Sequence, residues 1–323
     1  MALNWGILGG SAFALAQMAP AIHSAKGARL TALATSSSEK ASAFQAYFPD
    51  LRIHQSYEEL LGDPDIDAVY IPLPNTLHVE WTMKALQAGK HVLSEKPVAM
   101  KAAEIDALIA MRDRTGLLAT EAFMIVHHPQ WQRTKALIAD GVIGQLVHVQ
   151  GLFSYNNADQ PGNIRNTPET GGGAIPDIGV YTYGSTRFAT GEEITTITHA
   201  DLDYENGVDT LARVEARFET FSASWVNSMR MHPAQMMSFV GEAGVIRLSA
   251  PFNAGVFGEA EVELHHGDKV VTVERFPGVN HYVLQVEAFC RSVAEGKPYA
   301  WSLEDAQATQ SLIDAVYAKA GAD

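Results

Sequence analysis

The chain of 323 residues is long enough for two domains, and its 47% hydrophobic and 19% charged residues are ordinary for a globular protein. The formal net charge of −14 argues against a nucleic-acid-binding surface, which would need clustered lysine and arginine. The single cysteine, Cys290, excludes an internal disulfide and a multi-cysteine zinc site, and a lone thiol is compatible with the cytoplasm, where we expect the protein.

The predicted elements begin with a strand over 4–9 and a helix over 15–24, joined by a turn of small residues. This is the context of a dinucleotide-binding turn, because small residues let the backbone approach a pyrophosphate and a helix N-terminus attracts anions. Gly9 fits the G-x-G-x-x-G pattern, but Ser11 and Ala14 replace its second and third glycines. An ordinary strand–helix turn is therefore the alternative. The candidate cofactor-binding residues here are Gly9, Gly10, Ser11, Ala12 and Phe13.

The second strand, over 29–34, ends in a cluster of hydroxyl side chains. In folds of this type that prefer NAD, an acidic residue at this place holds the ribose hydroxyls. Here Ser36 and Ser37 occupy it, with Lys40 nearby, and this set tolerates a 2′-phosphate better than a carboxylate would. We therefore expect NADP, with NAD possible. The cluster is also typical of a helix N-cap, and both interpretations can hold together.

The next elements alternate between helix and strand. Helices are expected over 39–47, 57–61, 78–88 and 102–115. Strands are expected over 67–72 and 117–122, with a further short strand between them that runs to Lys96. Such alternation predicts an α/β domain with a doubly wound parallel sheet, a Rossmann domain, over residues 1–122. No apolar run approaches the roughly 20 residues that span a bilayer, and the first strand begins at once, so we expect no membrane contact and no signal peptide.

One of these strands ends at Glu95-Lys96-Pro97. The proline removes a backbone donor and fixes φ, so the strand stops there. This places Lys96 at the carboxyl edge of the sheet, where open α/β sheets bind ligands. A Glu-Lys pair is most often a solvated surface pair, so its position, rather than its composition, makes Lys96 a candidate for chemistry.

Residues 123–323 have a different texture. Helices are expected over 129–139, 282–294 and 303–320, and a further one over 177–186 is possible. Alternating segments predict strands over 146–155, 195–202, 210–218, 222–229, 237–240, 245–249, 262–265 and 269–274. Many strands with few helices indicate an α+β domain with a large, mostly antiparallel sheet that has one covered face.

Five segments together resemble the Gfo/Idh/MocA oxidoreductases, and the resemblance extends over essentially the whole chain. They are residues 9–14, 71–78, 95–97 and 121–124, and the run from Gly171 through Asp177 to Tyr181. The combination of Glu-Lys-Pro with the later Asp and Tyr is far more specific than the glycine turn. Because tyrosine rather than histidine stands at 181, the chain is most similar to the branch of dihydrodiol dehydrogenase, NADP-linked D-xylose 1-dehydrogenase and glucose-fructose oxidoreductase.

The resemblance implies an N-terminal domain that carries NAD(P) and a C-terminal sheet domain that forms the substrate wall and often a subunit interface. It implies that Lys96 and Tyr181 are catalytic with Asp177 beside them, and that these residues contact the substrate. His78 could equally be a helix residue without a role. The further cofactor contacts that the resemblance implies are Pro72, Leu73, Asn75, His78, Glu95 and Lys96.

The residue types suit the oxidation of a carbinol. That reaction needs a base for the hydroxyl proton while hydride leaves to the nicotinamide. A tyrosine has an ordinary pKa of about 10, and a nearby lysine cation would favour its phenolate. Asp177 would share a helix face with Tyr181 if 177–186 is helical, and could hold a second hydroxyl or the lysine.

The substrate contacts are less clear. Close relatives usually have an aromatic residue and an arginine after residue 124, whereas this chain has Ile125 and Val126. The missing contact could come from His127 or from Arg165, which follows Asn163 in a polar loop and could also be a loop-tip arginine. The adjacent histidine pairs 127–128 and 265–266 diverge in a strand or helix, so we expect no metal site.

These observations lead to one principal hypothesis. The chain is expected to be an NAD(P)-dependent oxidoreductase that acts on the CH–OH group of a cyclic polyol, at a sugar C1 hydroxyl or a vicinal diol. The alternatives are a keto-sugar reductase and a non-catalytic NAD(P)-binding regulatory protein. Because a one-sided sheet needs a cover, we expect a homodimer or homotetramer formed through the sheet of residues 123–323.

Overall fold

The computed structural model describes residues 2–267 and 269–321, and within them the chain forms two compact units. The first contains residues up to Met124 together with Asn280–Gln307, and the second contains Ile125–Val279 together with residues from Ala308 onward. The sequence analysis placed one domain boundary after residue 122, whereas in the structure residues 280–307 return to the first unit. They do so because their apolar side chains cover its core, as where the ring of Phe289 lies 4.9 Å from that of Trp5.

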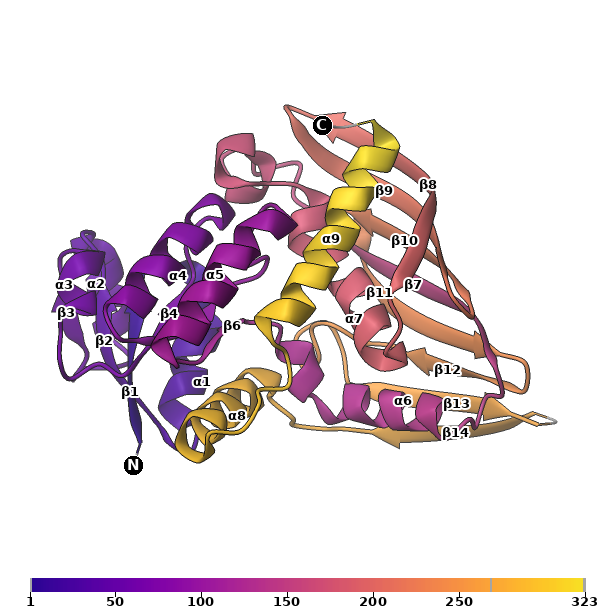
Figure 1. Cartoon of the computed structure of the whole chain (residues 1–323), viewed down its shortest axis with the longest axis horizontal. Coiled ribbons are helices and arrows are strands. Elements are labelled where there is room, and N and C mark those ends of the chain that lie inside the picture. The colour runs from indigo at the N-terminus through magenta and orange to yellow at the C-terminus, as the bar shows by residue number, and fades with distance from the viewer. Residues whose placement is uncertain (1, 268, 322–323) are drawn as a thin grey trace. The chain divides into compact units, whose positions relative to one another are not determined.

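The first unit contains a six-stranded sheet in the order β3-β2-β1-β4-β5-β6, and every neighbouring pair is parallel (Figure 1). This is the order of a Rossmann fold, and it confirms the predicted doubly wound sheet. The central strand β4 is buried along its whole length. The strands are β1 (Leu3–Leu8), β2 (Ala28–Ala34), β3 (Arg52–His54), β4 (Ala68–Ile71), β5 (His91–Ser94) and β6 (Ala119–Glu121).

Helices connect these parallel strands, as parallel connections require. The strand order reverses between β1 and β4, and ligands of such sheets bind beyond the carboxyl ends of the strands at this point. The helix after β1 begins as a π-helical turn, η1 (Ala14–Met18), and continues as α1 (Ala19–Ser24). The others are α2 (Ser38–Gln45), α3 (Tyr57–Leu61), α4 (His78–Gln87), α5 (Ala102–Thr115) and, from the returning segment, α8 (His281–Glu295).

The second unit contains an eight-stranded sheet in the order β14-β13-β12-β11-β7-β10-β9-β8 (Figure 1). Among the described strand pairs of this sheet, only β7–β10 is parallel, so the mostly antiparallel sheet is confirmed. The strands are β7 (Leu146–Asn156), β8 (Ile194–Glu205), β9 (Val208–Phe218), β10 (Ser222–Ser228), β11 (Arg230–Gly241), β12 (Gly244–Leu248), β13 (Glu261–His266) and β14 (Val270–Arg275).

Helices cover one face of this sheet. They are α6 (Pro129–Ala139), the π-helical turn η6 (Ile175–Gly179) and α7 (Val180–Thr190), which continues directly from η6. Gly151 of β7 lets α7 approach the strand, because a Cβ at this position would lie 3.3 Å from the Cβ of Thr182. On the same face, Tyr183 of α7 packs on Trp225 of β10 with ring centroids 4.9 Å apart. The face that carries Gly151 is therefore the core of the second unit.

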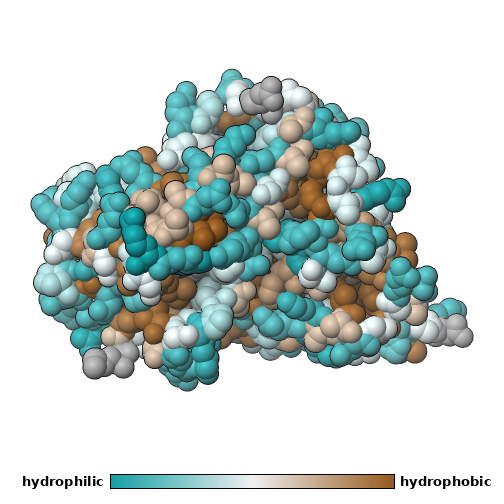
Figure 2. Space-filling view, in the orientation of Figure 1, coloured by the Kyte–Doolittle hydropathy of each residue, from teal (hydrophilic) through white to brown (hydrophobic). Residues whose placement is uncertain are grey.

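The last helix, α9 (Leu303–Ala320), contributes Leu303–Gln307 to the first unit and its remaining residues to the second. No helix within the described ranges is long and apolar enough to cross a membrane. On the face shown in Figure 2, hydrophobic residues form small areas separated by hydrophilic ones.

Candidate active site

The glycine turn follows β1 directly. Gly9 has a φ of 102°, which favours glycine, and a Cβ there would lie 2.9 Å from Cδ2 of Leu73. The hydroxyl of Ser11 accepts the N–H of Ala14 at 3.0 Å, so it satisfies one donor at the start of the helix. Phe13, in the first helical turn, is 38% exposed. The turn therefore offers the close backbone approach and the helix N-terminus that a pyrophosphate needs.

The hydroxyl cluster after β2 lies beside this turn. A Cβ on Gly10 would lie 3.1 Å from the Cβ of Lys40, so the base of the lysine side chain touches the turn. The hydroxyl of Ser37 accepts the N–H of Lys40 at 3.3 Å and caps α2, while Ser36 and Lys40 are exposed. The N-cap interpretation of Ser37 is thus confirmed. An exposed lysine next to a glycine turn also fits a dinucleotide that carries a 2′-phosphate.

The segment after β4 passes close to the same turn. Pro72 ends the strand, Leu73 packs against Gly9, and Asn75 begins a 3₁₀ turn, η2 (Asn75–Leu77). The structure therefore brings together the predicted residues that follow β1, β2 and β4.

The position of His78 differs from the one expected for a residue that contacts the cofactor. Its side chain has no exposed surface. Its Nδ1 lies 2.7 Å from the carbonyl oxygen of Pro97, and its Nε2 lies 2.8 Å from that of Leu73. Both ring nitrogens are thus used inside the protein, which leaves neither to contact a cofactor. Burial lowers the pKa of His78, and the two carbonyl contacts oppose that shift.

Lys96 follows β5, as predicted, and its side chain is half-buried. The adjacent Glu95 accepts a hydrogen bond from the hydroxyl of Tyr70 at 2.6 Å. The Lys96–Pro97 peptide is cis. Lys96 and Glu95 are thus held at the carboxyl edge of the sheet, between the segment after β4 and the end of β6.

A second carboxylate, that of Glu121 at the end of β6, belongs to the same environment. It is 2% exposed and accepts the N–H of Val98 at 2.9 Å and the indole N–H of Trp301 at 3.0 Å. Burial raises the pKa of Glu121, and these two donors and the charge of Lys96 oppose that shift. Although Glu121 lies in one of the segments that carry the family resemblance, nothing in the sequence indicated that its carboxylate is buried near Lys96.

In the second unit, Asp177 is the centre of a polar cluster. Its Oδ2 accepts the hydroxyl of Tyr155 at 2.7 Å and lies 2.8 Å from Nε of Arg165. Asp177 is 8% exposed. Burial and the Asp177 charge raise the pKa of Tyr155, while the Asp177 carboxylate raises that of Arg165. The structure therefore joins two predicted site residues, Asp177 and Arg165, and adds Tyr155, which the sequence analysis missed.

Tyr181 lies on the same helical segment. Asp177 belongs to η6 and Tyr181 to the first turn of α7, so the helix that the sequence left open over 177–186 is present. Tyr181 is 7% exposed, and its ring packs against those of Phe153, at 5.8 Å, and Phe252, at 5.7 Å, which stack on each other. These aromatic contacts fix the direction of the phenol.

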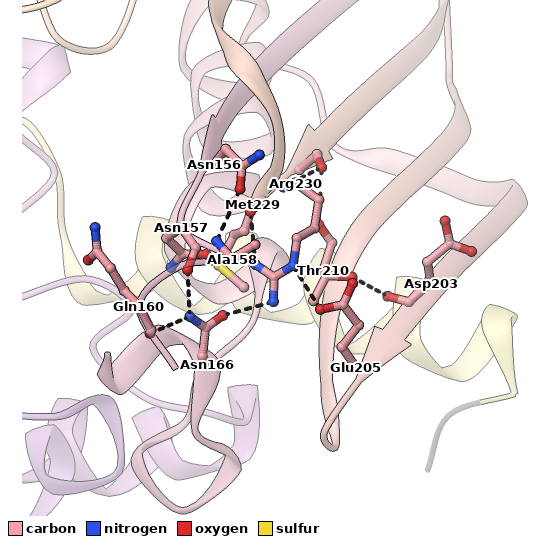
Figure 3. Close-up of polar contacts among 11 residues, drawn as sticks. Asn156, Asn157, Ala158, Gln160, Asn166, Asp203, Glu205, Thr210, Met229 and Arg230 are labelled. Carbon is pink, nitrogen blue, oxygen red and sulfur yellow. Dashed lines mark hydrogen bonds and ion pairs between the residues drawn. The ribbon is translucent and has the colours of Figure 1, made fainter. Parts of the chain in front are cut away.

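Arg165 comes from an irregular loop between β7 and η6, and this loop is anchored by Arg230 of β11 (Figure 3). Nη1 of Arg230 donates to Oδ1 of Asn157 at 2.7 Å, and Nη2 donates to Oδ1 of Asn166 at 3.1 Å. Its Nε contacts Glu205 at 2.8 Å. Asn166 donates in turn to the carbonyl of Asn157 at 3.2 Å. One guanidinium therefore holds the first residue of the loop, Asn157, and also Asn166, the neighbour of Arg165. No local sequence pattern predicted these contacts.

His127 ends a 3₁₀ turn, η3 (Met124–His127), and is half-buried. The next residue, His128, is the N-cap of α6, where its Nδ1 accepts the N–H of Gln130 at 3.1 Å. Across residues 2–267 and 269–321, no three His, Cys, Asp or Glu side chains form a group that could hold a metal ion.

Comparison with known families identifies two segments. Residues 3–123 match the model of an oxidoreductase family with an NAD-binding Rossmann fold, and residues 131–247 match the model of the GFO/IDH/MocA C-terminal domain.

Curated proteins match over nearly the whole length. D-xylose 1-dehydrogenase (NADP(+)) 2 from Haloferax volcanii is 31% identical over 319 residues, covering 98% of this chain and 97% of the relative. A dTDP-3,4-didehydro-2,6-dideoxy-alpha-D-glucose 3-reductase from Actinomadura kijaniata is 31% identical over 317 residues, covering 96% and 93%. The crystal structure of a 3-ketoreductase from Actinomadura kijaniata with NADP and TDP-benzene superimposes with a TM-score of 0.90 at 29% identity, covering 99% of this chain and 98% of that one.

Proposed function

The chain belongs to the Gfo/Idh/MocA family of NAD(P)-dependent oxidoreductases, and from this premise we propose that it transfers a hydride between NADP and a cyclic polyol, at a sugar C1 hydroxyl or a vicinal diol. The observation that carries the proposal is the cluster of Tyr155, Arg165 and Asp177 on and beside the helix of Tyr181. It combines charged donors and acceptors, which suit the neighbouring hydroxyls of a polyol.

NADP is proposed over NAD on the environment of the second strand. The strand β2 is followed by Thr35, Ser36 and Ser37 rather than by a carboxylate, and Lys40 touches the glycine turn. A cation here would pair with a 2′-phosphate, whereas an acidic side chain would repel it. The dehydrogenase from Haloferax volcanii is named for NADP, which supports the same choice.

When bound, the nicotinamide supplies or accepts the hydride. We assign the proton to the phenol oxygen of Tyr181, which receives it from the substrate hydroxyl during oxidation and returns it during reduction. We assign to the Lys96 ammonium the stabilisation of the phenolate and of the substrate oxygen. Asp177 and Arg165 bind further hydroxyls and so orient the carbinol carbon. His127 is proposed as a substrate contact in place of the residues that this chain lacks at 125 and 126.

Reduction of a keto-sugar is the second candidate. The Actinomadura kijaniata relative is named as a reductase, and the same residues serve both directions, because each step of the proton transfer is reversible. A regulatory protein that binds NAD(P) without turnover would have no use for the complete set of Lys96, Asp177 and Tyr181.

The test starts with cofactor binding. Titrations with NADP and with NAD, monitored by tryptophan fluorescence, give the affinity for each cofactor. D-xylose, D-glucose and a cyclic trans-diol are then added to the tighter complex while the absorbance of reduced nicotinamide is recorded. A rise with one polyol supports the dehydrogenase. If no polyol gives a rise, NADPH is tried with keto-sugars, and oxidation there supports the reductase. Tight binding without turnover in either direction would point to the regulatory protein.

Two variants test the residue assignments. Lys96→Met and Tyr181→Phe should each abolish turnover and leave cofactor affinity largely intact. Lys101→Met is the matched control, because Lys101 is exposed. Its backbone N–H donates to the Glu104 carboxylate at 2.9 Å and its carbonyl accepts the N–H of Glu104 at 3.1 Å, and both backbone contacts remain in the variant. Near-normal turnover in the Lys96→Met variant would refute the assignment.

We also propose that the chain is a homodimer or homotetramer formed through its eight-stranded sheet, and that it works in the cytoplasm, as its single cysteine suits a reducing compartment. Because Gly151 faces α7, the next residue along β7, Leu152, points to the opposite face, where Met236 is its cross-strand partner. Met236 is 36% exposed in the single chain. A monomer at micromolar concentration in light scattering would contradict this proposal.

A further inference from the structure

We propose that Asp209 is a positioning residue for the substrate-binding cluster; the inference rests on the proposed function. Asp209 lies near the start of β9 and is 2% exposed, yet the mechanism above does not use it. A buried carboxylate is costly unless it is hydrogen-bonded, so its partners indicate what it does.

Both carboxylate oxygens of Asp209 have partners. Oδ2 accepts the backbone N–H of Ile175 at 2.8 Å, and Oδ1 accepts the hydroxyl of Tyr317, from α9, at 2.7 Å. The N–H of Ala174 adds a further hydrogen bond. Asp209 thus satisfies backbone donors at the N-terminus of the helical segment that carries Asp177 and Tyr181, where a negative charge is favoured.

The turn above Asp209 also connects the two charged members of the cluster. The N–H of Gly173 donates to the carbonyl of Arg165 at 3.0 Å, and the carbonyl of Gly173 accepts the N–H of Asp177 at 3.2 Å. Gly173 has a φ of 134°, and a Cβ there would lie 2.2 Å from Oδ1 of Asp209. The carboxylate therefore fits against a glycine through which the backbones of Arg165 and Asp177 are joined.

This arrangement has a consequence for substrate binding. The Arg165 and Asp177 side chains meet at 2.8 Å, a distance that depends on the backbone positions of both residues. Asp209 supports the Asp177 end of this backbone link through Ile175, and the N–H of Gly173, which donates to the carbonyl of Arg165, supports the other end. Loss of the Asp209 carboxylate should displace both substrate-binding side chains together, while the fold of the sheet remains.

The first test is Asp209→Asn in the full chain, with kcat and KM measured at saturating NADP. An asparagine keeps the size of the side chain but replaces one acceptor oxygen by a donor. We expect kcat/KM to fall about 10- to 100-fold, with a raised KM, because small displacements of positioning groups have effects of this size. Cofactor affinity should stay unchanged. A purely structural role would lower the folded fraction and hence the apparent kcat, but would leave KM unaltered.

Two further variants keep the test decisive if Asp209→Asn folds poorly. Tyr317→Phe removes one partner of the carboxylate and should raise KM in the same direction by a smaller factor. Gly173→Ala should raise KM strongly, because its Cβ would collide with Asp209. The matched control is Gly191→Ala at the end of α7, where φ is 73° and nothing lies within 4 Å of the added Cβ. It should lower stability without changing KM.

Amide hydrogen exchange of the peptide over 173–181 separates this inference from the proposed function. Asp209→Asn should accelerate exchange there whether or not a substrate has been found. If the wild-type protein turns over no polyol and no keto-sugar, the proposed function fails, and unchanged exchange in the variant would overturn the inference independently. Wild-type KM with altered exchange would also overturn it, because Asp209 would then stabilise the turn without positioning the substrate.

Discussion

The imidazole Nδ1 of His78 lies 2.7 Å from the carbonyl oxygen of Pro97, the residue that follows Lys96. Its other nitrogen lies 2.8 Å from the carbonyl of Leu73, beyond the end of β4. The ring therefore ties the segment after β4 to the segment after β5. Because Leu73 also packs against Gly9, one buried histidine links the glycine turn to the segment that carries Lys96.

Replacing His78 by Gln should lower the free energy of unfolding by about 2 kcal/mol, because a buried carbonyl loses its donor and the packing is disturbed. Urea denaturation at pH 7 measures this change. His148→Gln is the control: its ring nitrogens contact the hydroxyls of Ser222 and Ser224 at a half-buried position, so the loss should be smaller. Equal losses in the two variants would contradict the special role of His78.

Lys40→Ala should raise the Kd of NADP by about tenfold, the value of one hydrogen bond to a charged group, and leave the Kd of NAD nearly unchanged. Tryptophan fluorescence titration of both cofactors measures the two constants. Lys26→Ala removes another exposed lysine from a loop at the amino-terminal end of β2 and should change neither. A parallel loss of affinity for both cofactors would show that Lys40 does not recognise the 2′-phosphate.

Arg230→Lys should loosen the loop that carries Arg165. A lysine can still pair with Glu205, but it cannot also hold Asn157 and Asn166 (Figure 3). We expect KM for the substrate to rise about tenfold, with cofactor affinity unaltered. Arg213→Lys on β9, whose exposed guanidinium pairs with Asp201, should leave KM at its wild-type value. If both variants behave alike, the loop does not depend on Arg230.

His128 should make the protein less stable in acid. Burial lowers its pKa from 6.5 to about 4, so as the pH falls below 6.5 the unfolded chain binds a proton that the folded chain does not. The resulting loss of stability is roughly 2 kcal/mol at pH 5. His128→Asn keeps an N-cap acceptor for α6 and removes this titration, so its stability should fall less between pH 7 and pH 5.

Urea denaturation at the two pH values measures the difference. His266→Asn, at an exposed position of β13, is the control and should follow the wild-type protein. Parallel pH dependence of the His128→Asn variant and the wild-type protein would refute the assignment.

Local sequence predicted the elements well wherever their ends carry local signals. The helix over Pro129–Ala139 has a proline at its first position and is followed by Asp140-Gly141, and the structure has the same bounds. The placement of Lys96 followed from a strand that stops at Pro97. The neighbouring Asp177 and Tyr181 were identified by resemblance, because an acid and an aromatic four residues apart are common in any helix.

The partners of the site residues could not be predicted. Trp301 donates to Glu121 across a separation of 180 residues, and no local pattern links the two. Asp209 follows Gly207 closely and looks like a solvated acid at a turn, yet it is buried under the turn at Gly173. Such contacts depend on how distant segments pack, which hydrophobic periodicity does not encode.

The return of residues 280–307 to the first unit bears on the order in which the protein is made. A chain emerging from the ribosome would have all six strands of the Rossmann sheet available after residue 121, but Phe289 and Trp301, which cover Trp5 and bind Glu121, arrive more than half a chain later. Meanwhile residues 125–279 have been released and can form their own sheet. The nucleotide-binding half is therefore the first to begin folding and among the last to finish, so a nascent chain has an extended period in which its core is exposed.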